Sequence, residues 1–278
     1  MTVPSDQSSP NEPAKDPESR GVAGPSGAGE SEVPELTKAE KDSIEEAEEE
    51  LANDAAPLPS LDELRAAMEW AFEVEDVEEV LLDRFADHAM MVLAGNRKVN
   101  LTSILEPREV AAKHYLDSWR ATQFLPIFGR TVLDLGCGAG FPSVPMAIAE
   151  PDTKFVALDS RRKRVDFVTE STEALGLRNL EPVWARGEEY LLQRRVDIVI
   201  TRAVSSVREN VRLLRKVRQS MHDLVMLKGK SWSRELKAGE REAERLGFRF
   251  DTVWEHELPG DMGKRAILIY RAPGGAGR

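Results

Sequence analysis

The chain of 278 residues contains a single cysteine, Cys137, and only 6% aromatic residues. One cysteine excludes an intrachain disulfide and any site built from several thiolate ligands. No run of eighteen apolar residues occurs, and the polar N-terminus lacks a basic region followed by an apolar stretch. The sequence therefore predicts a cytoplasmic protein that neither enters a membrane nor depends on a metal.

The acidic charge is confined to one end of the chain. Residues 1–60 hold 15 acidic and 4 basic side chains, which account for the whole net charge of -11, because the remaining residues hold 34 of each sign. This segment is rich in Pro, Ser, Gly and Glu and has too few apolar residues to offset the entropy of ordering. We expect a disordered acidic tail over residues 1–60. A solubilising role is favoured for this tail over a role as a competitor for basic residues on the surface of the folded part.

A glycine-rich turn between two apolar segments is the most informative motif. Residues 131–135 predict a strand, and Gly136, Gly138 and Gly140 follow it and allow a ligand to approach the backbone. After roughly twenty residues, the spacing of one βαβ step, residues 155–158 predict a second buried strand that ends at Asp159. The Asp159 carboxylate can accept both hydroxyl groups of a ribose, so this half of the sheet predicts a nucleotide-cofactor site.

Two features missing from this motif narrow the choice of cofactor. The glycines follow GxGxG, whereas a dinucleotide site requires GxGxxG, and no Gly-Lys-Ser or Gly-Lys-Thr follows to hold a triphosphate. A ribonucleoside without a pyrophosphate, such as S-adenosylmethionine, fits what remains. An NAD-dependent oxidoreductase stays an alternative, disfavoured because no convincing catalytic Lys/Tyr or His/Asp pair stands at a strand end.

The order of predicted elements indicates an α/β fold. Three helices are expected near 61–72, 77–93 and 107–125, and then strands alternate with helices, which implies a parallel sheet. The last two strands are joined by a connection so short that they must be antiparallel. The predicted domains are 61–126, a helical subdomain, and 127–278, a Rossmann-like domain. The predicted strands span residues 131–135, 154–159, 181–185, 196–201, 223–228, 248–258 and 266–271.

Basic residues cluster in two places after the glycine turn. Residues 201–250 hold 13 basic and 6 acidic side chains. Five basic residues recur there at spacings that predict one helix with most of them on the same side and with Val211 and Leu214 turned inward. These five are Arg208, Arg212, Arg215, Lys216 and Arg218. The second cluster is Arg161, Arg162, Lys163 and Arg164, at the start of a predicted helix. Both clusters are candidates for RNA phosphate contacts, and a solvated surface is the alternative.

Six segments together resemble one known family. They are residues 96–103 (NRKVNLTS), 113–118 (KHYLDS), 134–142, 158–160 (LDS), 201–203 (TRA) and 227–229 (LKG). In order and spacing these segments resemble the bacterial 16S rRNA guanine-N7 methyltransferases, the RsmG or glucose-inhibited division protein B family. The resemblance covers about residues 61–271. It implies a class I S-adenosylmethionine-dependent methyltransferase fold, with a mostly parallel seven-stranded sheet and one antiparallel strand.

The resemblance also implies site residues and partners. It places Phe141, Gly187 and Glu188 at the cofactor, beside the glycines and Asp159, and Arg202 at the crevice between cofactor and substrate as the catalytic residue. A structural ion pair is the alternative for Arg202. Lys228 is expected to contact RNA, and the partner is 16S rRNA or the small ribosomal subunit, bound by a monomer. His114 and Asp117 are either substrate contacts or a surface pair on one helix, and Asp134 is expected to organise the loop.

Residues that the sequence lacks also limit the reaction. Cys137 lies inside the glycine turn, so it is not placed to attack a cytosine, and no Asn/Asp-Pro-Pro-Tyr follows the fourth strand as adenine-N6 methyltransferases require. Guanine N7 has an in-plane lone pair and needs alignment rather than a general base. The resemblance places the target at guanine 527 in the 530 loop. A methyltransferase acting on another RNA or a small molecule, or a non-catalytic RNA-binding protein with a retained cofactor pocket, remains an alternative.

Overall fold

The structure is a computed structural model that describes residues 57–275. The predicted acidic tail lies almost wholly outside these residues, so its disorder stays a prediction. The helices begin and end close to the expected positions. They are α2 (Leu61–Ala71), α3 (Glu79–Asn96), α4 (Pro107–Val110), η1 (Ala111–Leu116), α5 (Asp117–Phe124), α6 (Ser143–Ala149), α7 (Arg162–Ala174), α8 (Gly187–Gln193), α9 (Val207–Leu213), η2 (Leu214–Lys216), η3 (Arg218–Ser220), α10 (Trp232–Arg245) and η4 (Pro273–Gly275).

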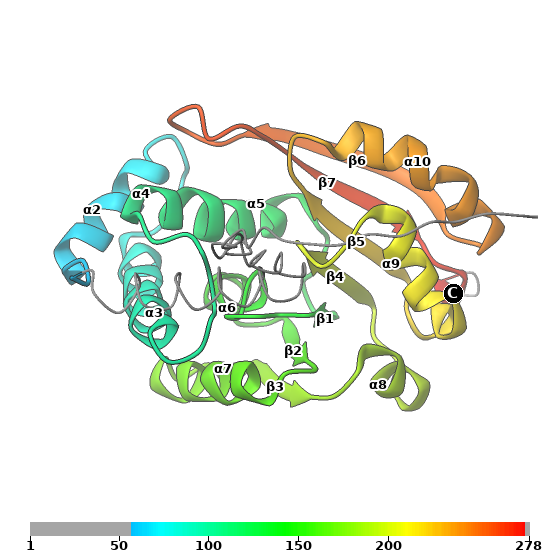
Figure 1. The fold of residues 1–278 in the computed structure, drawn as a ribbon, viewed down its shortest axis with the longest axis horizontal. Helices are drawn as coiled ribbons and strands as arrows, with labels where there is room; N and C mark the ends of the chain where they lie inside the picture. Colours follow the sequence, from blue (N-terminus) through cyan, green and yellow to red (C-terminus); the bar gives the residue numbers. More distant parts are fainter. Residues whose placement is uncertain (1–56, 276–278) are drawn as a thin grey trace, which may run out of the picture. The chain divides into compact units, whose positions relative to one another are not determined.

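The strands form one seven-stranded sheet in the order β3-β2-β1-β4-β5-β7-β6 (Figure 1). Neighbouring strands from β3 to β5 are parallel, and β7 runs antiparallel to both β5 and β6. The predicted mostly parallel sheet with one reversed strand is confirmed. The strands are β1 (Thr131–Leu135), β2 (Lys154–Asp159), β3 (Leu180–Trp184), β4 (Ile198–Arg202), β5 (Asp223–Lys228), β6 (Arg249–Glu257) and β7 (Lys264–Arg271).

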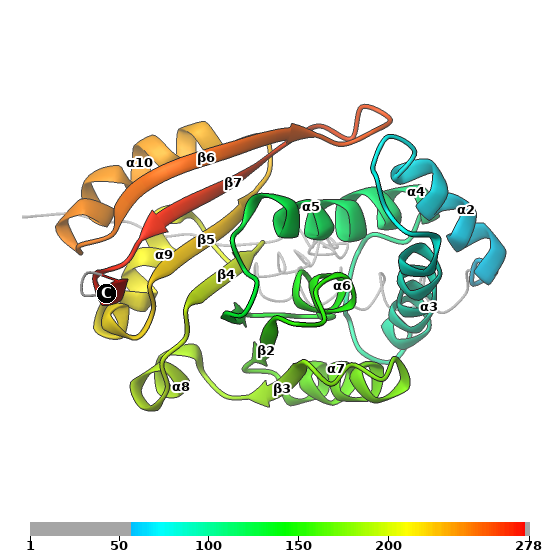
Figure 2. The ribbon, with the colours of Figure 1, turned by 180° about the vertical axis from the view of Figure 1, so that it is seen from behind.

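Alternate residues of the central strands feed two separate hydrophobic cores. Phe155 and Ala157 of β2 join the core beneath α3, α5, α6 and α7, whereas Val156 and Leu158 join the core beneath α8, α9 and α10. The strands are buried on both faces, which is why they read as continuous apolar runs in the sequence. Figures 1 and 2 show α9 and α10 over the β4–β7 half of the sheet.

The N-terminal helices belong to the first of these cores. Phe85 of α3 is fully buried and packs with its ring centroid 5.7 Å from that of Phe72 and 5.4 Å from that of Tyr115 in η1. The same cluster continues through Val132 and Phe155 into the sheet. The helices before β1 therefore stabilise the sheet that carries the glycine turn, and the boundary at residues 126/127 stays a prediction.

The single basic helix predicted around residues 208–218 is wrong. The α-helix α9 ends at Leu213, and two 3₁₀ segments, η2 and η3, carry the chain to Ser220. Val211 and Leu214 are buried as expected. The change from α-helix to 3₁₀ segments after Leu213 means that these basic residues do not share one helix face. Arg215 and Arg218 bond instead to the backbone carbonyl oxygens of Arg212 and Arg215.

Replacing Phe85 with Ala tests whether the helices and the sheet unfold together. Removing a fully buried Phe should lower the free energy of unfolding by about 3–5 kcal/mol. Because the core is continuous, far-ultraviolet circular dichroism and tryptophan fluorescence should report one transition, shifted to lower denaturant. Val80→Ala is the control, since Val80 lies on the same helix but is 54% exposed, and it should change stability by less than about 0.5 kcal/mol. Two separate transitions, only one of which shifts, would contradict a shared core.

Candidate functional site

The glycine turn that follows β1 is hydrogen-bonded to the end of β2. The backbone N–H groups of Gly136 and Cys137 donate to the Leu158 carbonyl oxygen at 2.8 and 3.0 Å, which fixes the turn against β2. Gly140 has a φ of +90°, and a Cβ there would lie 2.4 Å from Val144 Cγ2. A side chain at Gly140 would therefore be strained and would displace α6. Gly138 also has positive φ, but a Cβ there would point into open space.

Asp159, at the end of β2, organises the mouth of this turn. Its Oδ2 accepts a hydrogen bond from the Gly138 N–H at 3.1 Å, and its Oδ1 accepts one from the Arg161 N–H at 2.8 Å. Arg164 Nη1 lies 3.7 Å from Oδ2. A carboxylate has about four acceptor positions, so Asp159 keeps capacity for ribose hydroxyl groups.

These residues line a cavity of about 360 Å³ at the carboxyl ends of β1, β2 and β4. Of the predicted cofactor residues, it brings together Gly136, Gly138, Phe141, Asp159 and Arg202, with Arg161 and Arg164 at the same cavity. Gly140 does not line the cavity and lies against Val144 of α6. Gly187 and Glu188 begin α8, and neither lines this cavity; a Cβ on Gly187 would lie 2.3 Å from Leu135 Cδ1. Their contact with the cofactor stays a prediction.

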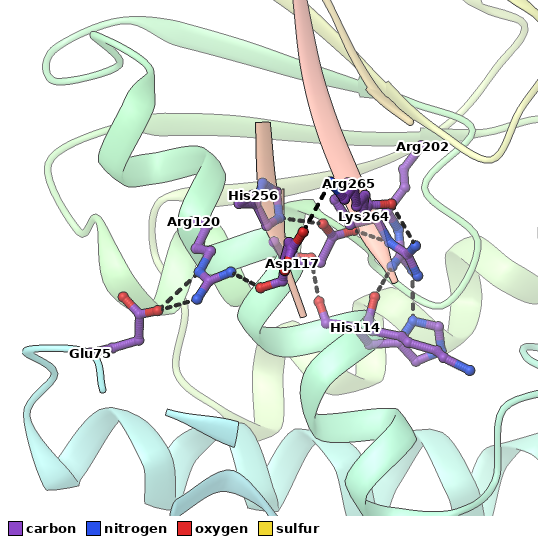
Figure 3. A network of polar contacts seen from close by, with 11 residues as sticks. Glu75, His114, Asp117, Arg120, Arg202, His256, Lys264 and Arg265 are labelled. Carbon is purple, nitrogen blue, oxygen red and sulfur yellow. Dashed lines mark hydrogen bonds and ion pairs between the residues drawn. The ribbon is translucent and has the colours of Figure 1, made fainter. Parts of the chain in front are cut away.

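Arg202, the last residue of β4, joins the sheet to the helical layer. Its Nη1 donates to the Lys113 carbonyl oxygen at 2.8 Å, and its Nη2 lies 3.0 Å from His114 Nδ1 (Figure 3). The guanidinium carbon also stands 5.0 Å from the centroid of the Phe141 ring. Burial lowers the pKa of Arg202, while the Asp117 and Asp134 carboxylates act in the opposite direction. The structural ion pair considered from the sequence is absent from the direct contacts of Arg202 within residues 57–275.

His114 is a neutral ring with a defined tautomer. Burial, and then the charge of Arg202, hold the pKa of His114 well below 6.5. Because a guanidinium only donates, His114 Nδ1 must accept from Arg202, so Nε2 carries the hydrogen and donates to Thr102 Oγ1 at 2.9 Å. The ring stacks on Phe141 at 4.4 Å between centroids. The helix is a π-helix at this point, a local form often found at functional sites.

The segment 96–103 is held against this ring by its own side chains. Asn96 Oδ1 accepts hydrogen bonds from the backbone N–H groups of Leu101 and Thr102, at 2.7 and 2.9 Å. These bonds fix Thr102, which in turn orients His114. The two sequence segments that carried the family resemblance before the glycine turn thus meet at one wall of the site.

Asp134 is an unusual buried carboxyl group behind the turn. Its Oδ2 accepts from the Ser143 N–H at 3.1 Å, which confirms the predicted role in organising the loop. Its Oδ1 is buried and has no hydrogen-bond partner among the described residues. Burial raises the pKa of Asp134 to about 6, against the lowering effect of the Ser143 hydrogen bonds and Arg202.

A second cavity of about 470 Å³ adjoins the first. Both are lined by His114, Arg202 and Ala203, and the second continues to Asp117, Lys228 and Arg265. Lys228 Nζ bonds to the Ser205 carbonyl oxygen and lies 2.9 Å from Glu235 Oε2. The alternative that His114 and Asp117 form a surface pair is wrong, because both are buried and each bonds to other residues. Sequence reasoning missed His256 and Arg265, which lie about 140 residues after Asp117 and carry no local motif.

The other basic residues predicted to contact RNA lie outside the two cavities. Arg162 stands over the Trp184 ring at 5.0 Å, and Lys163 is exposed on the first turn of α7. Arg208 is exposed on α9, and Arg212 pairs with Glu242 of α10 at 2.9 Å. Their role toward RNA stays a prediction.

A larger cavity, about 850 Å³, lies at the opposite, amino-terminal end of the parallel strands. Its carboxylates are already paired: Asp223 bonds Arg271 at 2.8 Å, and Asp197 lies 3.3 Å from His222 Nδ1. Ligands of open α/β sheets bind at the carboxyl ends of the strands, so we assign the site to the two smaller cavities. Within residues 57–275 no helix is long and apolar enough to cross a membrane, and no cluster of three metal-ligating side chains is found.

The strand order, the single reversed strand β7, the glycine turn after β1 and the acidic residue that ends β2 define a class I, Rossmann-like methyltransferase. The family model described as "rRNA small subunit methyltransferase G", GidB, matches residues 81–258. The chain belongs to this family. The resemblance expected from the sequence is thereby confirmed.

Individual relatives agree with the family model. A Deinococcus deserti protein named "Ribosomal RNA small subunit methyltransferase G" is 36% identical over 211 residues, which cover 74% of this chain and 85% of the relative. A Solibacter usitatus protein of the same name is 34% identical over 67% of this chain and 88% of its own length. Among solved structures, a SAM-dependent methyltransferase from Aquifex aeolicus is 19% identical, with a TM-score of 0.45 over 59% of this chain and 93% of that one.

Replacing Asp134 with Asn tests how much the burial of the ionised carboxyl group costs in stability. The pKa of Asp134 is about 6 in the folded protein and 3.8 as a model value, so the folded state binds the proton more tightly. Its contribution to stability is full below about pH 3.8 and is lost as the pH rises to about 6. Between about pH 4 and pH 7, the parent should therefore lose about 2 kcal/mol of unfolding free energy relative to Asp134→Asn. Urea unfolding at both pH values measures this, and parallel changes in the two proteins would contradict it.

Proposed function

We propose that the protein transfers a methyl group from S-adenosylmethionine to N7 of a guanine in 16S rRNA, expected at guanine 527. The observation that carries this proposal is the position of Arg202, which lines two adjoining cavities. One cavity holds the glycine turn and Asp159, and the other leads away from it between α5, β5 and β7. A cofactor in the first and a base in the second would meet beside this arginine.

The residues of the first cavity fit S-adenosylmethionine. Asp159 would hold the ribose hydroxyl groups, and Gly136 and Gly138 would let the cofactor lie on the backbone of the turn. The unpartnered Asp134 Oδ1 behind the turn, as a carboxylate, would favour a positively charged ligand. Bound there, S-adenosylmethionine supplies an electrophilic methyl group on a sulfonium.

The side chains around the junction of the cavities suit a reaction without a general base. Guanine N7 presents a lone pair in the plane of the base, so the enzyme has to align it and exclude water. His114 is neutral and both of its nitrogens are engaged, and burial raises the pKa of Cys137 well above its ordinary value. Neither group is available to take a proton or attack the base, which favours direct in-line transfer.

Basic residues in and around the two cavities would supply the electrostatic part of RNA binding. Arg161 and Arg164 lie at the cofactor cavity and Lys228 at the adjoining one, while Arg162, Lys163, Arg208 and Arg212 would meet phosphates further out. Such contacts position an RNA backbone without reading its sequence. We further propose that the protein acts as a monomer on the small ribosomal subunit or its rRNA, in the cytoplasm.

Methyl transfer to small subunits from a strain that lacks this gene tests the proposal. We expect label from S-adenosylmethionine at one guanine, detected as N7-methylguanine at nucleotide resolution. Arg202→Ala should lower the rate by about 100-fold or more, because it loosens the wall that aligns the two reactants. Arg130→Ala is the control, since Arg130 lies at the opposite end of the sheet. Label on another atom, or none, would refute the guanine-N7 assignment.

A matched pair of glycine variants tests the cofactor cavity. Gly138 and Gly129 both have positive φ, at +56° and +69°, and a Cβ on either would meet nothing within 4 Å. Gly138→Ala and Gly129→Ala should therefore lose similar stability, about 1–2 kcal/mol. Only Gly138 lines the cofactor cavity, so only Gly138→Ala should weaken S-adenosylhomocysteine binding, by about tenfold or more in calorimetry. Equal affinity of both variants would argue against this cavity as the cofactor site.

A further inference from the structure

Asp117 presents a carboxylate to the second cavity. Asp117, the first residue of α5, is only 4% exposed, and its Oδ1 accepts a hydrogen bond from His256 Nε2 of β6 at 3.1 Å (Figure 3). Its Oδ2 has no hydrogen-bond donor among residues 57–275, and Arg265 Nε lies 3.9 Å from it, beyond hydrogen-bond distance. Asp117 therefore lines the cavity with a carboxylate oxygen that accepts no hydrogen bond from the described residues and has only the distant charge of Arg265 opposite it, so a bound ligand can donate to it.

The other carboxylate of this cavity is already engaged. Glu235 Oε1 accepts from Ser231 Oγ at 2.8 Å, and Oε2 lies 2.9 Å from Lys228 Nζ. Arg202, at the other end of the cavity, uses two of its five N–H groups on Lys113 and His114 and keeps the rest. The cavity thus offers donors at the end shared with the cofactor and an acceptor at the far end.

We infer that Asp117 recognises the acceptor guanine by accepting hydrogen bonds from its N1–H and N2–H₂ groups. This inference rests on the proposed function. Asp117 follows His114 by three residues where η1 continues into α5, and both side chains line this cavity. With N7 directed at the cofactor cavity, O6 faces Arg202 and the opposite edge of the base faces Asp117.

The same arrangement rejects adenine at both ends. Adenine presents an amino group where guanine has O6, so donor would face donor at Arg202. It also presents an acceptor at N1, which would face the Asp117 carboxylate. His256 positions Asp117 from the hairpin β6–β7, so the last two strands of the sheet contribute to base selection without touching the cofactor. Ile104 and Leu227 add apolar surface to the lining of the same cavity.

Inosine, which lacks only the N2 amino group, provides the test. The substrates are small subunits reconstituted from rRNA that carries either guanosine or inosine at the target position. The methylation rate of each substrate is measured with the parent protein and with Asp117→Asn. The parent should prefer guanosine by roughly 10- to 100-fold in kcat/KM, the range expected for one well-placed recognition pair. Asp117→Asn should lower the guanosine rate by a similar factor and abolish the preference, while S-adenosylhomocysteine binding stays within about twofold.

Asp223→Asn is the matched control. Asp223 is equally buried at 4% exposure and also pairs with a basic side chain, but it lies at the opposite end of the sheet. It should keep the preference for guanosine even if it loses stability. A parent enzyme that methylates inosine and guanosine at equal rates would overturn the inference, and this comparison holds even where Asp117→Asn fails to fold. A parent that leaves guanosine N7 unmethylated would instead remove the proposed function itself.

Discussion

The contact of Arg202 with the η1 segment holds the site together. One guanidinium at the end of β4 bonds to the Lys113 carbonyl oxygen and to His114 Nδ1, and faces the Phe141 ring. Three elements that are far apart in the sequence meet there: the helical layer, the glycine turn and the central strand of the sheet. A charge-assisted donor is suited to this place, since it fixes the His114 tautomer and leaves N–H groups free for a ligand.

The N-terminal helices give this contact its rigidity. Tyr115 and His88 pack against the Phe141 ring, Phe85 packs against Tyr115, and Tyr115 Oη bonds to His88 Nδ1 at 2.9 Å. Burial lowers the pKa of His88 to about 3, so this layer carries no charge of its own near neutral pH. A neutral, close-packed layer holds the π-helical segment in place without competing electrostatically with Arg202.

The β6–β7 hairpin plays the corresponding part on the other side of the site. Arg120 of α5 bonds to Glu75 and to the Glu257 carbonyl oxygen at the end of β6, while His256 bonds to Asp117 one turn earlier on the helix (Figure 3). These bonds attach the reversed end of the sheet to the helix that carries His114 and Asp117. The hairpin is therefore more than an edge of the sheet, because His256 of its outer strand β6 positions Asp117 in the wall of the second cavity.

The sequence by itself determined the strands, the glycine turn, Asp159 and the family, because each depends on local spacing and residue type. The continuous apolar runs predicted buried parallel strands, and positive φ at the turn required glycine at fixed positions. The sequence did not predict the conformation of residues 208–218, where the α-helix ends at Leu213 and 3₁₀ segments follow in spite of the helical periodicity. Nor could it find the pairing of Asp117 with His256, since only the packing of β6 against α5 brings together residues so distant in the chain. Tertiary structure alone decided which polar side chains are buried, and therefore which of them can recognise a base.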